Sequence, residues 1–341
     1  MSPASEGGLA PAGSTAARGH GLALATVLIW GVTFVSTKVL LEGCSPIEIL
    51  FFRFALGFAA LWAIRPRLLR VAGWRDELLF VAAGACGVTL YFLMENIALV
   101  YTTASNVGVI VAVAPLFTGL IASLVLREGT LGRRFFIGFA LAIAGIALIS
   151  FVGGAGAPAD AGAADAGLGL VGCLLALLAA IVWAVYSNIS KRISAHGYGT
   201  VLATRRTFFW GLAFMLPCLP LLGFDPDWSF VLTPLALGNL VFLGLGASAL
   251  CYVMWNTAVR ELGPVKTTAY IYLVPVVTIA TSVAILGEPL TPAIVAGALL
   301  TIAGLVISEL KPRAAAPAAS ALEAEGCEDG PEQADSLRRG A

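Results

Sequence analysis

The sequence predicts an all-α integral membrane protein whose ten transmembrane helices form two inverted repeats of five. Three observations lead to this fold class. Of the 341 residues, 59% are hydrophobic and only 12% are charged, whereas a soluble domain carries about a quarter charged residues. Apolar stretches of membrane-spanning length recur along the chain. The second half also repeats the unusual residues of the first half in the same order.

The apolar stretches predict the ten helices one by one. A helix needs about 20 apolar residues to cross roughly 30 Å of hydrocarbon. The stretches are continuous rather than alternating, which excludes the strands of a membrane barrel. The expected spans are 22–40, 46–64, 78–99, 103–126 and 134–152 in the first half, and 168–190, 201–222, 235–259, 265–286 and 292–310 in the second.

The repeat consists of matched polar, aromatic and proline positions, which a shared apolar composition does not explain. The matched pairs are Trp30 and Trp183, Lys38 and Lys191, Arg53 and Arg206, Asn96 and Asn256, Pro115 and Pro275, and Glu128 and Glu288. Six of these residues form a symmetry-related charged set, namely Lys38, Arg53, Glu128, Lys191, Arg206 and Glu288.

The distribution of basic residues fixes the orientation of the helices. Most of the 20 Lys and Arg lie in or beside loops that share one face, whereas the opposite loops at 100–102, 153–167, 223–234 and 287–291 contain none. Positive charge is retained on the cytoplasmic side, so we expect both termini in the cytoplasm and the chain in the cytoplasmic (inner) membrane. Because each repeat has an odd number of helices, the second repeat is inverted relative to the first.

The composition also divides the chain into five segments. Residues 1–20 and 311–341 are rich in small and polar residues and are expected to be disordered cytoplasmic tails. The first tail has no apolar stretch and is therefore not a cleavable signal peptide. The repeats occupy 21–152 and 168–310, and the segment 153–167 links them outside the cytoplasm.

Several function classes are disfavoured by what the sequence lacks. The net charge of zero leaves no basic surface for nucleic acid. The six cysteines have no CxxC spacing, so no zinc site is indicated. An intramembrane enzyme needs a nucleophile with a base or a metal, yet the histidines are only His20 and His196 and no HExxH occurs. We therefore expect no catalytic residue, metal or cofactor, and as partners only the lipid bilayer and a small molecule.

The matched prolines predict two hinges. Pro115 and Pro275 fall near the middle of the fourth and ninth helices, where each removes the donor to the carbonyl of Val111 or Ile271. A freed carbonyl in a membrane is tolerated only against protein or a wet cavity. Both prolines are therefore expected to face a central cavity, with simple bending for packing as the alternative.

Polar and aromatic side chains within the apolar spans predict the wall of that cavity. A charge at the bilayer centre costs on the order of 3 kcal/mol, and spacings of four place several of these residues on shared helix faces. Such a wall suits a small amphipathic molecule. The predicted cavity residues are Trp30, Thr33, Phe34, Tyr91, Glu95, Asn96, Asn106, Trp183, Ser187, Asn188, Tyr252, Trp255, Asn256, Tyr270 and Tyr272.

Glu95 is the acidic residue that breaks the repeat, because Trp255 occupies the matching position. This asymmetry makes Glu95 the candidate for proton coupling. Structural roles remain open for other residues. Asn96 and Asn256 can equally bond neighbouring helices. The four basic residues of the symmetry-related charged set lie near expected helix ends and can extend to the interface or bind lipid phosphate, while its two glutamates can pair with local Arg or backbone.

Each half of the chain, from about 20 to 310, resembles an EamA domain of the drug/metabolite transporter superfamily. The resemblance rests on the W-x7-K segment, the Arg53-Phe54 and Arg206-Thr207 steps, the Asn-x-Ala end of the third helix, the proline, the closing Glu, and the IAG stretches at 143–145 and 302–304. It implies a ten-helix secondary carrier with a central cavity lined mainly by helices one, three, four, six, eight and nine. Many such carriers export amino acids, metabolites or toxic compounds.

Inverted repeats are typical of alternating access, with substrate bound near the membrane midplane. We therefore expect a secondary active transporter, working as an exporter of a small amphipathic metabolite, an amino-acid-like compound or a drug. A channel and a non-transporting sensor on the same scaffold are the alternatives. The sequence leaves the substrate, the direction, the coupling ion and the oligomeric state open.

Overall fold

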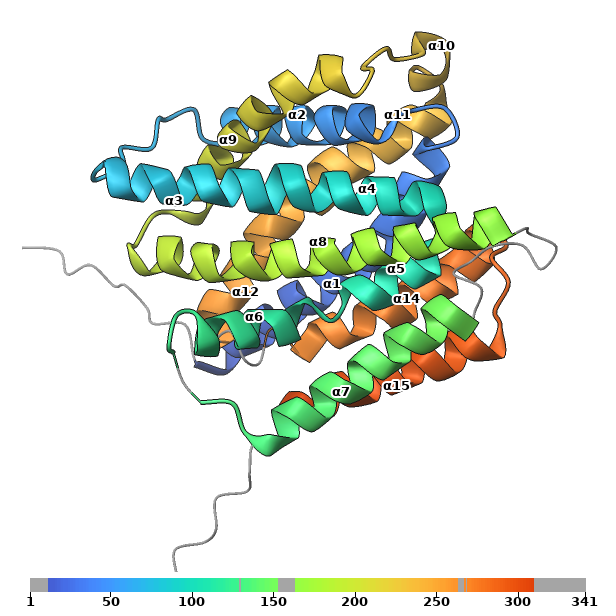
Figure 1. Ribbon diagram of the computed structural model, residues 1–341. Helices are drawn as coiled ribbons and strands as arrows, with labels where there is room; N and C mark the ends of the chain where they lie inside the picture. Colours follow the sequence, from blue (N-terminus) through green and yellow to red (C-terminus); the bar gives the residue numbers. More distant parts are fainter. Residues whose placement is uncertain (1–11, 129, 153–162, 263–266, 268, 310–341) are drawn as a thin grey trace, which may run out of the picture. The chain divides into compact units, whose positions relative to one another are not determined.

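Helices form almost all of the chain that the structure describes (Figure 1). The computed structural model describes residues 12–128, 130–152, 163–262, 267 and 269–309. These residues belong to one unit, Met1–Glu309. The expected C-terminal tail, most of the expected N-terminal tail and most of the linker lie outside the described residues.

The first repeat contains five membrane helices, three of them built from two or more segments. The elements are α1 (Ala12–Leu40), α2 (Pro46–Ile64), α3 (Trp74–Gly84), the π-helix η1 (Ala85–Leu90), α4 (Tyr91–Tyr101), α5 (Ala104–Val111), α6 (Ala114–Leu124), α7 (Arg133–Ala147) and the π-helix η2 (Leu148–Val152).

The second repeat follows the same plan, with the short helix α10 added in a loop. Its elements are α8 (Ala163–Ala195), α9 (Thr200–Leu221), α10 (Trp228–Val231), α11 (Pro234–Val241), the π-helix η4 (Phe242–Leu250), α12 (Cys251–Leu262), the 3-10 helix η5 (Ala269–Leu273), α14 (Val274–Thr281), the π-helix η6 (Ser282–Leu286) and α15 (Pro292–Glu309).

Each of the ten predicted spans is helical over most of its described residues, which confirms the fold class. Seven helices are long and apolar enough to cross a membrane, and two shorter apolar helices cover Tyr270–Leu286 and Pro292–Ser308. The remaining membrane helix, α9, carries Arg205, Arg206 and two internal prolines. Three helix starts lie several residues before the sequence prediction, and that of α3 is at Trp74 instead of 78. The helix α1 begins at Ala12 and α8 at Ala163, earlier than expected, because alanine-rich segments that cannot form a core can still extend an existing helix.

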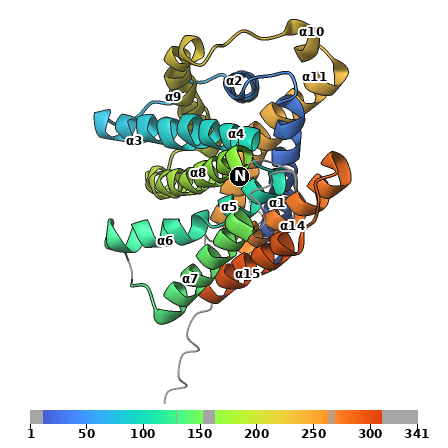
Figure 2. The same cartoon turned by 45° about the vertical axis from the view of Figure 1, so that its right-hand side comes forward.

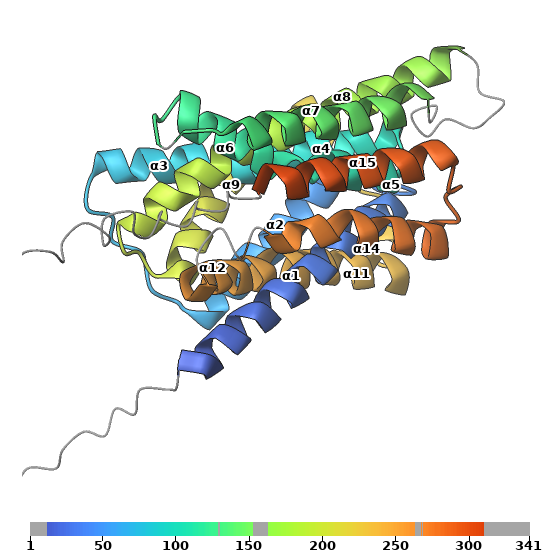
Figure 3. The same ribbon diagram turned by 90° about the horizontal axis from the view of Figure 1, so that it is seen from below.

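The last helices of the two repeats, α7 and α15, pack side by side along their lengths (Figures 1 and 3). A Cβ atom on Gly138 would lie 2.3 Å from the carbonyl oxygen of Gly304, and one on Gly145 would lie 2.5 Å from that of Gly297. In the repeat, Gly138 matches Gly297 and Gly145 matches Gly304. Gly138 thus contacts the counterpart of Gly145, and Gly145 contacts the counterpart of Gly138. A two-fold axis between inverted halves requires this reciprocal pairing.

The fourth and ninth helices both break at the matched prolines. The helix α5 ends at Val111 and α6 begins at Ala114, with Pro115 in its first turn. Similarly, η5 ends at Leu273, and Pro275 lies in the first turn of α14. Proline is favoured at a helix start because it has no N–H to leave unpaired. The expected loss of helical bonding is therefore present at both positions, although movement about them stays a prediction.

Both of these helices end in the same turn, which positions the matched glutamates. Gly287 has φ +65°, and the matching Arg127 has φ +56° although it carries a side chain. In each turn the glutamate N–H donates to the carbonyl six residues earlier, at 2.8 Å for Glu128 and 3.4 Å for Glu288. The two repeats thus place these carboxylates in equivalent positions.

Candidate functional site

An inner cavity of about 70 Å³ lies between the two repeats. Figure 2 shows the central helices that surround this region, including α1, α4, α8 and α14. The side chains that line the cavity come from seven of the ten membrane helices. They are Trp30, Thr33, Phe34, Arg53, Tyr91, Phe92, Glu95, Val111, Ala112, Ala114, Pro115, Trp183, Tyr252, Ile271 and Val274.

Aromatic rings form much of the inner cavity wall. The matched residues Trp30 and Trp183 meet edge to face, with ring centroids 6.2 Å apart and planes at 86°. Trp183 also packs against Tyr91 at 4.6 Å, and Trp30 packs against Trp255 at 5.1 Å. The indole N–H of Trp30 donates to the Ala247 carbonyl at 3.1 Å. The rings therefore have fixed positions and offer flat apolar surfaces to a ligand.

Arg53 brings a buried positive charge to this wall. It lies in the middle of α2 and is only 2% exposed. Its Nε donates to the Ser248 hydroxyl at 2.7 Å, and its guanidinium lies 4.1 Å from the centroid of the Phe92 ring. The expectation that this arginine extends to the membrane interface is wrong, because Ser248 and the aromatic face of Phe92 hold it inside the protein.

Glu95 places a carboxyl group in the same cavity. It lies on α4 and is 1% exposed. Tyr91 lies one helical turn earlier on the same helix and lines the same cavity. The helix segment before α4 is the π-helix η1, which adds an extra residue to the turn and rotates Tyr91 and Glu95 relative to a regular α-helix. π-helical turns of this kind are frequent at functional sites.

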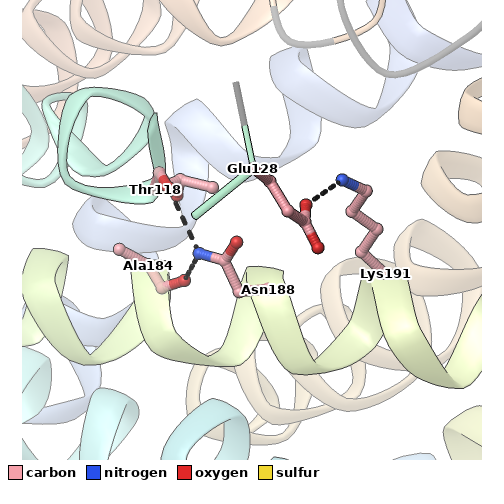
Figure 4. A network of polar contacts seen from close by, with 5 residues as sticks. All are labelled: Thr118, Glu128, Ala184, Asn188 and Lys191. Atoms are coloured by element: carbon pink, nitrogen blue, oxygen red, sulfur yellow. Dashed lines mark hydrogen bonds and ion pairs between the residues drawn. The ribbon is translucent and has the colours of Figure 1, made fainter. Parts of the chain in front are cut away.

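A larger vestibule of about 450 Å³ continues from the inner cavity, since both are lined by Trp30, Pro115, Trp183 and Ile271. Its polar wall comes mainly from α8. Figure 4 shows Asn188 donating to the carbonyls of Thr118 and Ala184, at 3.2 and 2.9 Å. The other residues that line the vestibule are Thr118, Gly119, Ser187, Asn188, Ser190, Lys191, Ser194, Trp255, Asn256 and Val259.

At the vestibule end, Lys191 and Glu128 form an ion pair with a 2.7 Å separation (Figure 4). Both side chains are largely solvent-accessible, at 66% and 43% exposure. The hydrogen bond from Lys191, together with its positive charge, lowers the pKa of Glu128 below its ordinary value. This pair joins two exposed side chains, and Lys191 belongs to the lining of the vestibule.

The opposite end of the bundle is closed by the residues that match this pair. The Glu288 carboxylate accepts hydrogen bonds from the N–H groups of Ala104 and Ser105, at 2.7 and 3.1 Å, and from the Ser105 hydroxyl at 2.7 Å. Lys38 donates to the Leu99 and Thr102 carbonyls. The N-terminus of α5 carries unpaired N–H groups and partial positive charge, so Glu288 fixes α5 against the end of the ninth helix.

The structure places most of the predicted cavity residues at these two linings. The inner cavity includes Trp30, Thr33, Phe34, Tyr91, Glu95, Trp183 and Tyr252, and the vestibule adds Ser187, Asn188, Trp255 and Asn256. Their role in binding a substrate stays a prediction. The lining of neither cavity includes Asn96, Asn106, Tyr270 and Tyr272.

Those remaining residues occupy other positions. Asn96 donates to the Pro46 carbonyl at 3.1 Å, which is the interhelical bonding named as its alternative. Asn106 donates to the Thr102 hydroxyl at 3.0 Å, at the closed end. The Tyr270 hydroxyl is 2.7 Å from Nδ1 of His20.

Sequence reasoning missed Arg53 and Phe92 as cavity residues. Arg53 is the eighth residue of α2, which begins at Pro46. An arginine two turns into an apolar helix cannot easily reach either interface, and this depth was the signal that could have identified it. Its counterpart Arg206 does lie outside the cavity, where it pairs with Glu77 at 2.8 Å.

Comparisons with known proteins agree with this architecture. Residues 17–151 and 170–310 each match the EamA-like transporter family. An uncharacterized transporter of Archaeoglobus fulgidus is 27% identical over 86% of this chain and 97% of its own length. A probable terminal-alkyne amino-acid exporter of Streptantibioticus cattleyicolor is 30% identical, covering 83% and 90%. A probable amino-acid metabolite efflux pump of Salmonella typhimurium is 28% identical, covering 84% and 93%.

A crystal structure with 20% sequence identity has the same fold. Its TM-score is 0.59, and the match covers 87% of this chain and 96% of the other. Both repeats match the family, and the paired prolines and glutamates occupy equivalent places in the two halves. The chain is therefore a multi-pass membrane protein that belongs to the EamA-like transporter family.

Proposed function

We propose that this protein is a secondary carrier that exports a small amphipathic molecule across the cytoplasmic membrane by alternating access. One observation carries the proposal: two equivalent ends of the bundle are in different states. Glu288 joins the start of α5, whereas the Glu128 carboxylate, among the residues that the structure describes, pairs with the exposed Lys191. In inverted repeats, exchange of the two conformations between the halves gives a second state with the opposite end closed.

The direction in which the cavity opens follows from the charge distribution. Basic loops favour the side that carries Lys191 and Arg260 as the cytoplasmic side, with both termini there. The vestibule then faces the cytoplasm, which is where an exporter collects its substrate. Pro115 and Pro275 are the proposed hinges, since the helices are already broken there.

An amino-acid-like substrate is supported by two separate arguments. The cavity has an apolar and aromatic wall with a few polar groups, as small-molecule sites generally do. The relatives from Streptantibioticus and Salmonella are named as an amino-acid exporter and an amino-acid metabolite efflux pump. Glu95 is the proposed proton carrier, because it is a carboxylate that faces the cavity.

Transport by the purified full-length chain in proteoliposomes tests this function. Untargeted comparison of the metabolites exported by cells with and without the protein first supplies the test solute. A carrier loaded with unlabelled solute should then accumulate labelled solute transiently by counterflow. Flux without counterflow would indicate a channel, and no flux of any exported metabolite would contradict a transport function.

The proton role has its own test in the same vesicles. Glu95→Gln keeps the size of the side chain but removes its titration. The variant should lose acceleration of transport by a pH gradient while still exchanging solute at saturating concentration, even where its affinity for the solute is lower. If the gradient drives the variant as well as the wild type, Glu95 does not couple protons.

Accessibility tests the inward-facing state in a background without native cysteines. Ser187→Cys in the vestibule should react with a membrane-impermeant thiol reagent in inside-out vesicles and stay unreactive in right-side-out vesicles. Ser36→Cys is the matched control, because Ser36 is buried and bonded to Asn239. Equal labelling of Ser187→Cys from both sides would contradict a closed outer end.

A further inference from the structure

Two charged groups that face the inner cavity lack part of their hydrogen bonding. Nη1 of Arg53 and Oε1 of Glu95 are buried, and neither has a hydrogen-bond partner among the residues that the structure describes. Both residues line the inner cavity. Buried polar atoms in proteins are almost always bonded, because an unbonded one has lost its water without replacement. An unbonded donor and an unbonded acceptor in one cavity therefore point to a ligand that carries both complements.

The two groups do not satisfy each other. They attract each other electrostatically, but the salt bridges of the described residues include neither. Each is instead held by the fold around it. The Ser248 hydroxyl accepts a hydrogen bond from Nε of Arg53, and Glu95 is buried on α4 one turn after the buried Tyr91. The remaining atoms are thus held apart in fixed positions, as a preorganised binding site requires.

We propose that the inner cavity binds the α-amino carboxylate head group of a zwitterionic amino acid. Nη1 of Arg53 donates to the substrate carboxylate, and Oε1 of Glu95 accepts from the substrate ammonium. This inference rests on the transport function proposed above and names the substrate class of the same site. A zwitterion satisfies both atoms and adds no net charge to the cavity, whereas a simple amine or acid leaves one of them unbonded.

The dimensions of the two connected cavities assign the substrate side chain as well. The inner cavity, at about 70 Å³, has room for the small head group, and the vestibule of about 450 Å³ lies beyond it. The passage between them runs past Trp30, Pro115, Trp183 and Ile271, which present mainly apolar surface. The side chain directed into the vestibule is therefore apolar or aromatic.

Binding to the purified wild-type protein tests the inference without any substitution. The probes are L-leucine, its decarboxylated analogue 3-methylbutylamine and its deaminated analogue 4-methylpentanoate, with the matching series for L-phenylalanine. Binding is followed by the change in tryptophan fluorescence, because Trp30 and Trp183 line both cavities. At least one amino acid should bind ten times more tightly than both of its analogues. Equal binding within each series, or no binding of either amino acid, would overturn the proposal.

Two substitutions separate direct recognition from a structural role. Arg53→Gln should remove the preference for the amino acid over the amine, and Glu95→Gln should remove the preference over the carboxylic acid. Arg206→Gln is the matched control, since Arg206 holds the equivalent position but pairs with Glu77 outside the cavity. A purely structural role would weaken all three probes by the same factor. If a variant fails to fold, the wild-type series still decides.

Failure of this inference is distinguishable from failure of the transport function. Counterflow of another exported metabolite, without preference for a zwitterion, would leave the carrier intact and overturn only the assignment to Arg53 and Glu95. Absence of flux for every metabolite would contradict the transport function itself.

Discussion

Substitution of Glu288 by glutamine should loosen the closed end of the bundle. The carboxylate accepts three hydrogen bonds from Ala104 and Ser105 at the start of α5. A hydrogen bond to a charged group contributes about 1 kcal/mol more than one to a neutral group, and the helix dipole adds a further 0.3–1 kcal/mol. Glutamine also has only one oxygen, so at least one bond is lost. Allowing for non-additivity, we expect the local contact to weaken by about 2 kcal/mol.

Hydrogen exchange measures this change directly at the amides involved. A loss of about 2 kcal/mol corresponds to roughly 30-fold faster exchange, since each 1.4 kcal/mol is a factor of ten. Mass spectrometry of peptides that cover Ala104 and Ser105 should detect it in purified protein. Glu128→Gln is the control and should leave these peptides unchanged, because the Glu128 carboxylate pairs with Lys191 at the other end of the bundle. Less than threefold acceleration in a folded Glu288→Gln variant would refute the capping role.

Four further substitutions test packing, turn geometry and charge. Gly145→Ala should lower the free energy of unfolding by about 1–3 kcal/mol through a clash in the α7–α15 contact. Gly238→Ala is the control, because Gly238 has open space around it, and it should raise the free energy of unfolding by roughly 0.5–1 kcal/mol. Thermal unfolding measures both changes. Arg127→Gly should increase the unfolding temperature by relieving positive φ, and a decrease would contradict the strain. Lys191 lowers the pKa of Glu128 below its ordinary value of 4.5. The stabilising effect of this pair should therefore be present above about pH 4.5 and disappear as the pH falls further. A difference in unfolding temperature between Glu128→Gln and the wild type that persists in acid would contradict this.

Periodicity and polarity were sufficient to predict the helices and much of the cavity wall. Trp30 and Trp183 are central in long apolar spans, and an interior position is the only inexpensive place for their indole N–H groups. The prolines were recognisable because a missing backbone donor is a local property of the chain. Features encoded within a single helix were therefore accessible from the sequence.

Features that depend on contacts between helices were not accessible in this way. The burial of Arg53 depends on Ser248, which lies almost two hundred positions later in the chain. The π-helical turns that orient Glu95 and Tyr252 have no sequence pattern of their own. Likewise, Glu288 was recognised as a matched residue, but its bond to α5 depends on which end of the bundle is closed.

The glycine contact between α7 and α15 also bears on the origin of the chain. Gly138 meets Gly304 and Gly145 meets Gly297, so the surface is complementary to its own inverted copy. Two separate molecules of a single five-helix ancestor, inserted in opposite orientations, would make the same contact as an isologous dimer interface. Gene fusion would then have needed only a connecting segment and no new packing surface.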